Sequence, residues 1–280
     1  MTSRSKTNKT QPSKTSTNIT AANKTVVANK SESNKPLDEE RIAMLKYLRL
    51  GNLLANWDDY LSKAGKGRYS AERLLTFALE EEYRAKQENA RLLRRQRASI
   101  PESLEMETFP FDRQPKLDRR KIMSYYDSFQ YMALHRNLVW LGPTGCGKTG
   151  LATAFLLQAI DRGHRGYFVT FPELLQQLFQ SMADRSEAKV LKRFLAFDPL
   201  VVDEVGYVEV EPAQVGQFFT LMHKRHKQKT TLITSNLGFS EWGSFLHNAH
   251  LTSALIDRLT SNCHTINMKD CTSLRDKLAE

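Results

Sequence analysis

The sequence is poor in cysteine. Its 280 residues include only three cysteines, Cys146, Cys263 and Cys271. Thiols in this number and spacing provide neither a disulfide framework nor the four ligands of a structural zinc site. The sequence also lacks an apolar run as long as a membrane span, and its first residues contain no apolar signal core. These absences predict a protein outside the membrane in a reducing, intracellular setting, most simply the cytoplasm.

Acidic residues are nearly absent from the first part of the chain. Residues 1–36 consist largely of Lys, Ser, Thr and Asn, and their basic side chains face a single acid, Glu32. Because this segment has little apolar surface to bury, we expect it to be disordered. Two main roles remain open for it, a solubilising tail or a source of salt-dependent attraction to phosphates. A transit peptide ranks third, because such a peptide would be richer in Arg and more amphipathic.

Positive charge predominates over the whole chain. The formal net charge is +10 and the pI is about 9.5. This balance favours an anionic partner, most simply nucleic acid, although a basic surface that only confers solubility has the same composition. A chain of 280 residues is long enough for one sizeable core and a smaller module.

The most specific pattern is a phosphate-binding loop, which matches G-x-x-x-x-G-K-[ST]. Its residues are Gly142, Pro143, Thr144, Gly145, Cys146, Gly147, Lys148 and Thr149. We expect Lys148 to bind the β- and γ-phosphates of a nucleotide and the Thr149 hydroxyl to hold Mg²⁺. Backbone N–H groups of the loop and the N-terminus of the following helix would face the same phosphates. Cys146 is interpreted as a small spacer and not as a nucleophile.

After residue 122, short apolar runs alternate with helical patterns. The expected strands are 137–141, 166–171, 199–203 and 230–235, and the expected helices are 123–135, 148–162, 172–183, 186–197 and 212–227. Strands rich in β-branched residues that alternate with helices predict an α/β domain with a mainly parallel sheet covered on both faces. This domain is expected to occupy residues 123–280.

A small helical domain is expected over residues 37–97. Ser70 is a plausible N-cap for its longest helix, after a break at residues 65–67. Residues 98–122 contain three prolines and are interpreted as a linker. The long helix ends in a basic cluster of Arg91, Arg94, Arg95 and Arg97. Such a cluster fits a solvated helix face, and it also fits contacts with DNA phosphates.

Polar side chains follow two of the expected strands. Asp203 and Glu204 end one strand, and Asn236 follows another. Ligands gather at the carboxyl ends of parallel strands, so these residues are expected beside the phosphate loop. Asp203 would assist Mg²⁺, and Glu204 would orient or deprotonate the water that attacks the γ-phosphate. Asn236 could bind that water or the γ-phosphate, although Asn is also a common turn residue.

The chain from about Arg41 to Arg275 resembles the IstB family, the ATP-binding helper proteins of IS21-type transposons. That family is close to the bacterial helicase loaders among the AAA+ ATPases. Besides the phosphate loop, the matching stretches are Leu48-Arg49-Leu50, Asp203-Glu204-Val205-Gly206-Tyr207, Leu232-Ile233-Thr234-Ser235-Asn236, Glu241-Trp242-Gly243 and Ala254-Leu255-Ile256-Asp257-Arg258-Leu259. The resemblance implies a P-loop AAA+ ATPase domain that binds ATP with Mg²⁺.

The resemblance also implies roles that spacing does not reveal. Arg258 looks like an arginine finger that completes the ATP site of a neighbouring subunit. Arg275 is similar in position to a second sensor of the γ-phosphate, with Ser-Leu-Arg here in place of the family's Ser-Tyr-Arg. Gly150 stands where the family usually has a histidine. Relatives place DNA-facing helices before the acidic strand, which implicates Lys189, Lys192 and Arg193.

We therefore expect an oligomeric ATPase that assembles on duplex DNA and assists the transposase of the same element. DNA contact should be largely independent of base sequence, because the chain shows charge but no helix-turn-helix or zinc-finger signature. The main alternative is an adaptor that loads a replicative helicase. A third hypothesis is a DNA-binding scaffold that binds ATP without turnover, and the intact Lys148, Asp203 and Glu204 argue against it.

Overall fold

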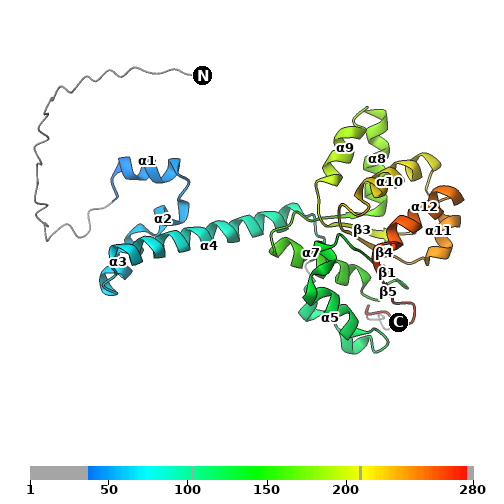
Figure 1. Ribbon diagram of the computed structural model, residues 1–280, viewed down its shortest axis with the longest axis horizontal. Helices are drawn as coiled ribbons and strands as arrows, with labels where there is room; N and C mark the ends of the chain where they lie inside the picture. Colours follow the sequence, from blue (N-terminus) through cyan, green and yellow to red (C-terminus); the bar gives the residue numbers. More distant parts are fainter. Residues whose placement is uncertain (1–36, 103, 208–209, 276–280) are drawn as a thin grey trace, which may run out of the picture. The chain divides into compact units, whose positions relative to one another are not determined.

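The computed structural model describes residues 37–102, 104–207 and 210–275 (Figure 1). The expected disordered tail, residues 1–36, lies outside the described residues. The chain divides into two compact units, residues 1–79 and 80–280. This division falls within one long helix, 18 residues before the end of the expected helical domain at residue 97. Among the described residues, no helix is both long and apolar enough to cross a membrane.

The first unit is helical. Its elements are α1 (Glu39–Tyr47), α2 (Gly51–Ala55), α3 (Trp57–Lys66) and the first part of α4 (Ala71–Arg97). The side chain of Ser70 accepts a hydrogen bond from the backbone N–H of Arg73 at 3.2 Å, which confirms the predicted N-cap. Tyr60 is buried and packs edge-to-face on Phe77, with 5.0 Å between ring centroids.

The second unit is built on a five-stranded sheet. Its strands are β1 (Asn137–Leu141), β2 (Tyr167–Thr170), β3 (Leu200–Val205), β4 (Thr231–Ser235) and β5 (Cys263–Asn267). The strand order is β2-β3-β4-β1-β5 and every neighbouring pair is parallel, which confirms the expected parallel sheet. Strand β5 has no counterpart among the expected strands. It lies at the edge of the sheet, and of its residues only Ile266 is buried, so its sequence lacks an apolar run.

Helices cover both faces of the sheet (Figure 1). They are α5 (Arg119–Ser128), α6 (Gln130–Ala133), α7 (Lys148–Asp161), α8 (Phe171–Ala183), α9 (Glu187–Leu195), α10 (Pro212–Arg225), α11 (Phe239–Phe245) and α12 (Ala249–Thr260). The helix expected at 123–135 was wrong in its bounds. It begins four residues earlier because the Asp118 side chain caps it by accepting from Lys121 N at 3.0 Å, and it breaks at Phe129, whose φ is +54°.

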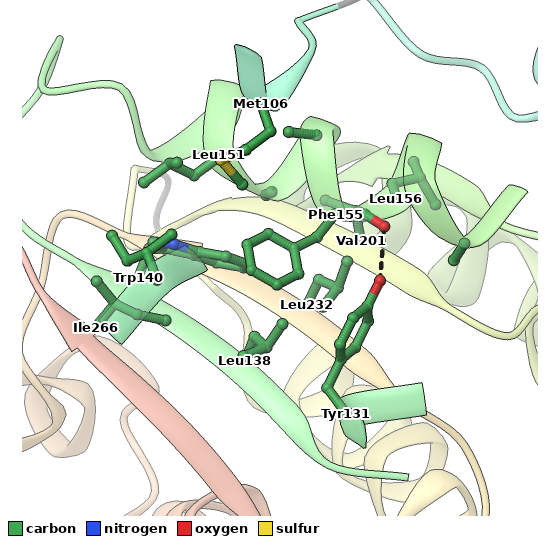
Figure 2. Close-up of a cluster of buried hydrophobic side chains, with 14 of the residues drawn as sticks. Met106, Tyr131, Leu138, Trp140, Leu151, Phe155, Leu156, Val201, Leu232 and Ile266 are labelled. Carbon is green, nitrogen blue, oxygen red and sulfur yellow. Dashed lines mark hydrogen bonds between the residues drawn. The ribbon is translucent and has the colours of Figure 1, made fainter. Parts of the chain in front are cut away.

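Alternate residues of each strand enter two separate cores. Leu138 and Trp140 of β1 face the core formed with α7, whereas Val139 and Leu141 face the core formed with α8 to α12. Figure 2 shows the first core, where the Tyr131 hydroxyl donates a hydrogen bond to the carbonyl oxygen of Phe155 at 2.9 Å. Helix α7 is therefore held firmly against the sheet directly behind the phosphate loop.

Arg225, at the end of α10, is almost completely buried. Its guanidinium group donates to the carbonyl oxygens of Phe194 at 3.0 Å, Phe197 at 2.8 Å and Thr230, and to the hydroxyl of Thr231 at 3.0 Å. Burial lowers the pKa of Arg225 to about 10. One side chain thus fastens α10 to the end of α9 and to the start of β4.

We expect Arg225→Met to lower the free energy of unfolding by about 3 kcal/mol, because it leaves buried carbonyl groups without a donor. Lys224→Met, at the exposed neighbouring position, should change it by less than about 0.5 kcal/mol. Denaturant unfolding followed by circular dichroism measures both values. Equal stabilities of the two variants would contradict a structural role for the guanidinium group.

Candidate functional site

The phosphate loop connects β1 to α7 and takes a shape that requires glycine. Gly145 has a φ of +80° and Gly147 a φ of +96°, both in the left-handed region. A Cβ atom on Gly147 would also lie 2.7 Å from the ring of Phe109 and 3.0 Å from Leu274. Even a small side chain at this position would therefore displace neighbouring atoms as well as strain the backbone.

Two segments distant in sequence hold the loop in place. The buried side-chain amide of Gln114 donates to the carbonyl oxygens of Cys146 at 3.2 Å and Thr272 at 2.6 Å, and it accepts from Thr272 N at 3.0 Å. Leu274 N also donates to the carbonyl oxygen of Gly145 at 2.8 Å. The linker and the C-terminal segment are thus both joined to the loop. Sequence reasoning missed Gln114 because a single glutamine in a linker matches no motif.

Lys148 is folded back onto the loop. Its side-chain ammonium donates to the carbonyl oxygens of Gly142 at 2.8 Å and Pro143 at 2.7 Å. The residue is 7% exposed, and burial lowers the pKa of its ammonium group. Phosphate oxygens would supply the opposite charge that these neutral carbonyl groups do not.

A buried carboxylate lies beneath the loop. Thr149 donates from its hydroxyl to both carboxylate oxygens of Asp203 at 3.1 Å, and the hydroxyl of Thr234 donates to one of them. Asp203 is 3% exposed, and burial raises the pKa of its carboxyl group while the two hydroxyls oppose that rise. Sequence reasoning missed Thr234. Its position at the end of a strand next to the acidic strand is the signal that could have revealed it.

The donor set of Thr149 and Asp203 fits a magnesium ion. A hydroxyl and a carboxylate present the hard oxygen atoms that Mg²⁺ prefers, and they lie at the start of α7 where phosphates are expected. Mg²⁺ also keeps several of its waters and is held through few protein ligands, so this small set is sufficient. The residues present are therefore compatible with the predicted metal.

Strand β3 ends in an irregular turn beside the loop. Glu204 is exposed and has a φ of +64°, and its backbone N–H donates to the hydroxyl of Thr234 at 3.0 Å. Three residues later, the hydroxyl of Tyr207 lies 2.9 Å from the hydroxyl of Thr144. The turn after β3 therefore contacts the phosphate loop through the hydroxyl groups of Tyr207 and Thr144.

A cavity of about 590 Å³ brings most of the predicted residues together. Its lining consists of Glu102, Leu104, Glu105, Thr108, Phe109, Pro110, Thr144, Gly145, Gly147, Lys148, Thr149, Gly150, Glu204, Tyr207, Thr234, Leu274 and Arg275. The linker contributes much of one wall, which the sequence did not indicate. A volume of this size is in the range of small-molecule sites. The lining combines apolar side chains, such as Leu104, Phe109 and Leu274, with the polar residues of the phosphate loop, a mixture that suits the base and the phosphates of a nucleotide.

Three of the predicted catalytic residues do not line this cavity: Asp203, which lies beneath the loop, and Asn236 and Arg258. Asn236 has its buried carbonyl oxygen against Gly206, without a hydrogen-bond partner among the described residues. Arg258 lies on α12, where it donates to His223 at 3.0 Å and to the carbonyl oxygen of Ala254 at 2.8 Å. Its guanidinium also covers the ring of Phe219, 5.1 Å from the centroid. Within one chain, therefore, Arg258 is held apart from the cavity.

The arginines at the end of α4 fasten this helix to the end of α7. Arg91 and Arg95 both form ion pairs with Asp161, and Arg94 donates to the carbonyl oxygen of Ile160 at 3.2 Å. Arg97 is exposed. A basic side chain near a helix C-terminus is favourable for the helix dipole, so these contacts have a structural explanation.

The other basic candidates lie on α9. Lys189, Lys192 and Arg193 are all exposed. Arg193 donates to the side chains of Gln177 and Tyr167, both at 3.0 Å, and its guanidinium lies over the Tyr167 ring. The two lysines on this helix therefore offer positive charge to solvent more freely than the arginines of α4 do.

Comparison with known proteins gives consistent results. A family model described as IstB-like ATP binding protein matches residues 43–279. The chain is 29% identical over 226 residues to the predicted ATP-binding protein of insertion sequence IS21 from Pseudomonas aeruginosa, covering 81% of this chain and 85% of that protein. It is also 29% identical over 231 residues to the counterpart in insertion sequence IS5376 of Geobacillus stearothermophilus, covering 82% and 92%.

Among solved structures, the chain is similar to AMPPCP-bound DnaA from Aquifex aeolicus. The TM-score is 0.51 at 16% sequence identity, and the match covers 61% of this chain and 52% of that one. At this identity the similarity shows the fold alone. Together with the parallel sheet and the loop between β1 and α7, it confirms the expected P-loop AAA+ fold.

Asp203→Asn should raise the melting temperature of the nucleotide-free protein. A carboxyl group whose pKa is raised by folding makes the folded state less stable once pH exceeds its ordinary pKa of about 4. The amide keeps partners for Thr149 and Thr234 without the charge. Thermal unfolding from pH 4 to pH 8 should show the variant's advantage growing with pH.

Asp161→Asn is the matched control and should behave in the opposite way. Although burial opposes it, hydrogen bonding and charge from Arg95 and Arg91 lower the pKa of Asp161 overall. Its carboxylate therefore stabilises the fold at neutral pH, and this contribution is lost as pH falls. The interpretation of the Asp203 site would be refuted by a lower melting temperature of Asp203→Asn at pH 8.

Proposed function

The chain belongs to the IstB-like ATP-binding protein family, and we propose that it is an ATPase that assembles on duplex DNA and assists the transposase of its own insertion element. The observation that carries the proposal is the cavity in which Lys148, Thr149 and Glu204 meet above the buried Asp203. The two relatives described above are ATP-binding proteins of insertion sequences, which supports transposition over the alternative of helicase loading.

Binding of ATP would use the loop in its present shape. Backbone N–H groups at the start of α7 point toward the phosphate position, and the helix dipole favours negative charge there. Lys148 would exchange its two carbonyl partners for phosphate oxygens, which compensates the desolvation that lowers its pKa. The apolar wall from Leu104, Phe109 and Leu274 would cover the remainder of the nucleotide.

Hydrolysis needs a base and compensation of the developing charge. Glu204 lines the cavity and is proposed to orient and deprotonate the attacking water. Thr149 and Asp203 would hold Mg²⁺, which supplies charge compensation on the β- and γ-phosphates. Arg275 also lines the cavity, and its cationic side chain would bind the γ-phosphate within the same subunit.

Arg258 is proposed to act on the site of a neighbouring subunit. In its own subunit it lies outside the cavity, half-exposed on α12, with His223 and Phe219 fixing its direction. A cation that is pre-oriented at the surface can stabilise phosphoryl transfer across an interface with little loss of side-chain entropy. This arrangement would make turnover depend on a homo-oligomer.

DNA is the proposed anionic partner. The net charge is +10, and α9 presents Lys189 and Lys192 to solvent. Such contacts would address phosphates, so affinity should depend on salt much more than on base sequence. Arg91, Arg94 and Arg95 would contribute through the field of the whole surface, because each already has a partner on α7.

Glu204→Gln should retain ATP binding and lower kcat at least about 100-fold, because the amide cannot accept a proton. The trapped ATP-bound protein should form large assemblies on duplex DNA, whereas Lys148→Ala should bind no ATP and assemble only as the nucleotide-free protein does. Phosphate release and particle size, each with and without duplex DNA, measure these effects.

The control for charge alone is Glu72→Gln, at an exposed position in α4, which should behave as the wild type. Normal turnover of Glu204→Gln would remove this residue from catalysis. Particle sizes that do not respond to ATP or DNA in the wild type would contradict the proposed function itself.

A mixture of Arg258→Ala and Glu204→Gln proteins should recover part of the ATPase activity that each lacks alone. In a mixed assembly, an intact Glu204 of one subunit can meet an intact Arg258 of its neighbour. Steady-state phosphate release from the mixture, with mixed assembly verified by affinity tags, is the measurement. No recovery in verified mixed particles would exclude action between subunits.

A further inference from the structure

Tyr207 belongs to a matching motif but has no role in the function proposed so far. Its hydroxyl lies 2.9 Å from the hydroxyl of Thr144, the third residue of the phosphate loop. The two residues are 63 positions apart in sequence, and both line the cavity. Both side chains are exposed, Tyr207 to 41%, so no core packing forces them together.

The hydroxyl pair lies at the end of the loop where the terminal phosphate is expected. The ammonium of Lys148, the group that reaches β- and γ-phosphates, rests on the carbonyl oxygens of Gly142 and Pro143, directly before Thr144. Glu204, the proposed base, lines the same cavity and precedes Tyr207 by three residues. Lys148 and Glu204, which are expected to act on the terminal phosphate, therefore line the same cavity as the hydroxyl pair.

The turn that delivers Tyr207 is built for this approach. Gly206 has a φ of +107°, a conformation that side chains other than glycine rarely adopt. A Cβ atom there would lie 2.6 Å from the side-chain oxygen of Asn236 and 2.7 Å from Leu237. Close packing of this turn on the residues after β4 directs the chain back toward the phosphate loop. The side chain of Asn236 thus packs directly against the turn at Gly206.

Hydroxyl chemistry suits the recognition of a phosphate. When one hydroxyl donates to the other, the hydrogen of the acceptor hydroxyl remains free to be donated elsewhere. A γ-phosphate supplies charged acceptor oxygens at this point, and hydrogen bonds to charged acceptors are the stronger kind. A nucleoside diphosphate has no γ-phosphate, so the hydroxyls of Tyr207 and Thr144 would form no hydrogen bond with it at this position.

We propose that Tyr207 and Thr144 form a hydroxyl clamp that binds the terminal phosphate and makes the site distinguish ATP from ADP. This inference rests on the proposed function, since it takes ATP to be the ligand. The clamp adds a specificity element to the contacts of Lys148 and Arg275. The clamp also gives both residues after the acidic strand a purpose. Gly206 forms the turn, and Tyr207 brings its hydroxyl back to the phosphate loop.

The test compares the affinities of a slowly hydrolysed ATP analogue and of ADP, both measured by calorimetric titration on the full chain. Tyr207→Phe and Thr144→Val should each weaken the analogue about tenfold, the effect of one hydrogen bond to a charged group, and leave ADP unchanged. The double variant should be no weaker than either single variant, because the two hydroxyls act as a unit.

Thr144→Ser keeps a hydroxyl and should retain the wild-type preference for the analogue. Tyr125→Phe is the matched control, because Tyr125 stacks on His264 outside the nucleotide cavity, and it should change neither affinity. Melting temperatures of all variants establish that they fold.

Three results would overturn the clamp. They are an unchanged preference in Tyr207→Phe, an equal loss for both nucleotides, and strictly additive effects in the double variant. These outcomes leave the proposed function intact, because the wild type still binds ATP. A wild-type protein that binds neither nucleotide would instead refute the proposed function and the clamp together.

Discussion

The buried carboxylate of Asp203 is the constraint on which the site depends. It lies near the C-terminal end of β3 and accepts hydrogen bonds from Thr149 at the start of α7 and from Thr234 at the end of β4. A carboxylate in this position is unfavourable for folding unless hydroxyl groups satisfy it. The parallel sheet supplies them, because the ends of adjacent strands and the following helix start meet at one edge. The negative charge of Asp203 lowers the stability of the nucleotide-free protein, and the same charge is suited to binding a metal ion.

The cavity above this carboxylate is assembled from segments that are distant in sequence. Phe109 and Gln114 of the linker and Leu274 of the C-terminal segment contact the loop, and Gln114 also joins the linker to Thr272. The glycines of the loop therefore serve two purposes, positive φ angles and space for these neighbours. Residues of the linker are therefore part of the nucleotide site and not only a connection between domains.

The basic side chains of the chain serve different purposes, and some of them stabilise the fold. The arginines of α4 satisfy Asp161 and the C-terminal end of α7, so they stabilise the fold, although their clustering resembles a phosphate-binding face. Lys189 and Lys192 of α9 are exposed to solvent instead. Arg258 occupies an intermediate position, since contacts with His223 and Phe219 orient it at the surface without neutralising its charge.

Local sequence by itself determined the phosphate loop, strands β1 to β4 and the cap at Ser70, because each depends on neighbours within a few residues. It missed β5, whose short polar edge strand has no apolar run, and it misplaced the helix around Phe129. Only the tertiary structure decided that Asn236 and Arg258 lie outside the cavity. It alone also decided the contacts of Thr234, Gln114 and Tyr207. These contacts join residues about 30 or more positions apart, and chain folding alone brings such residues within hydrogen-bonding distance.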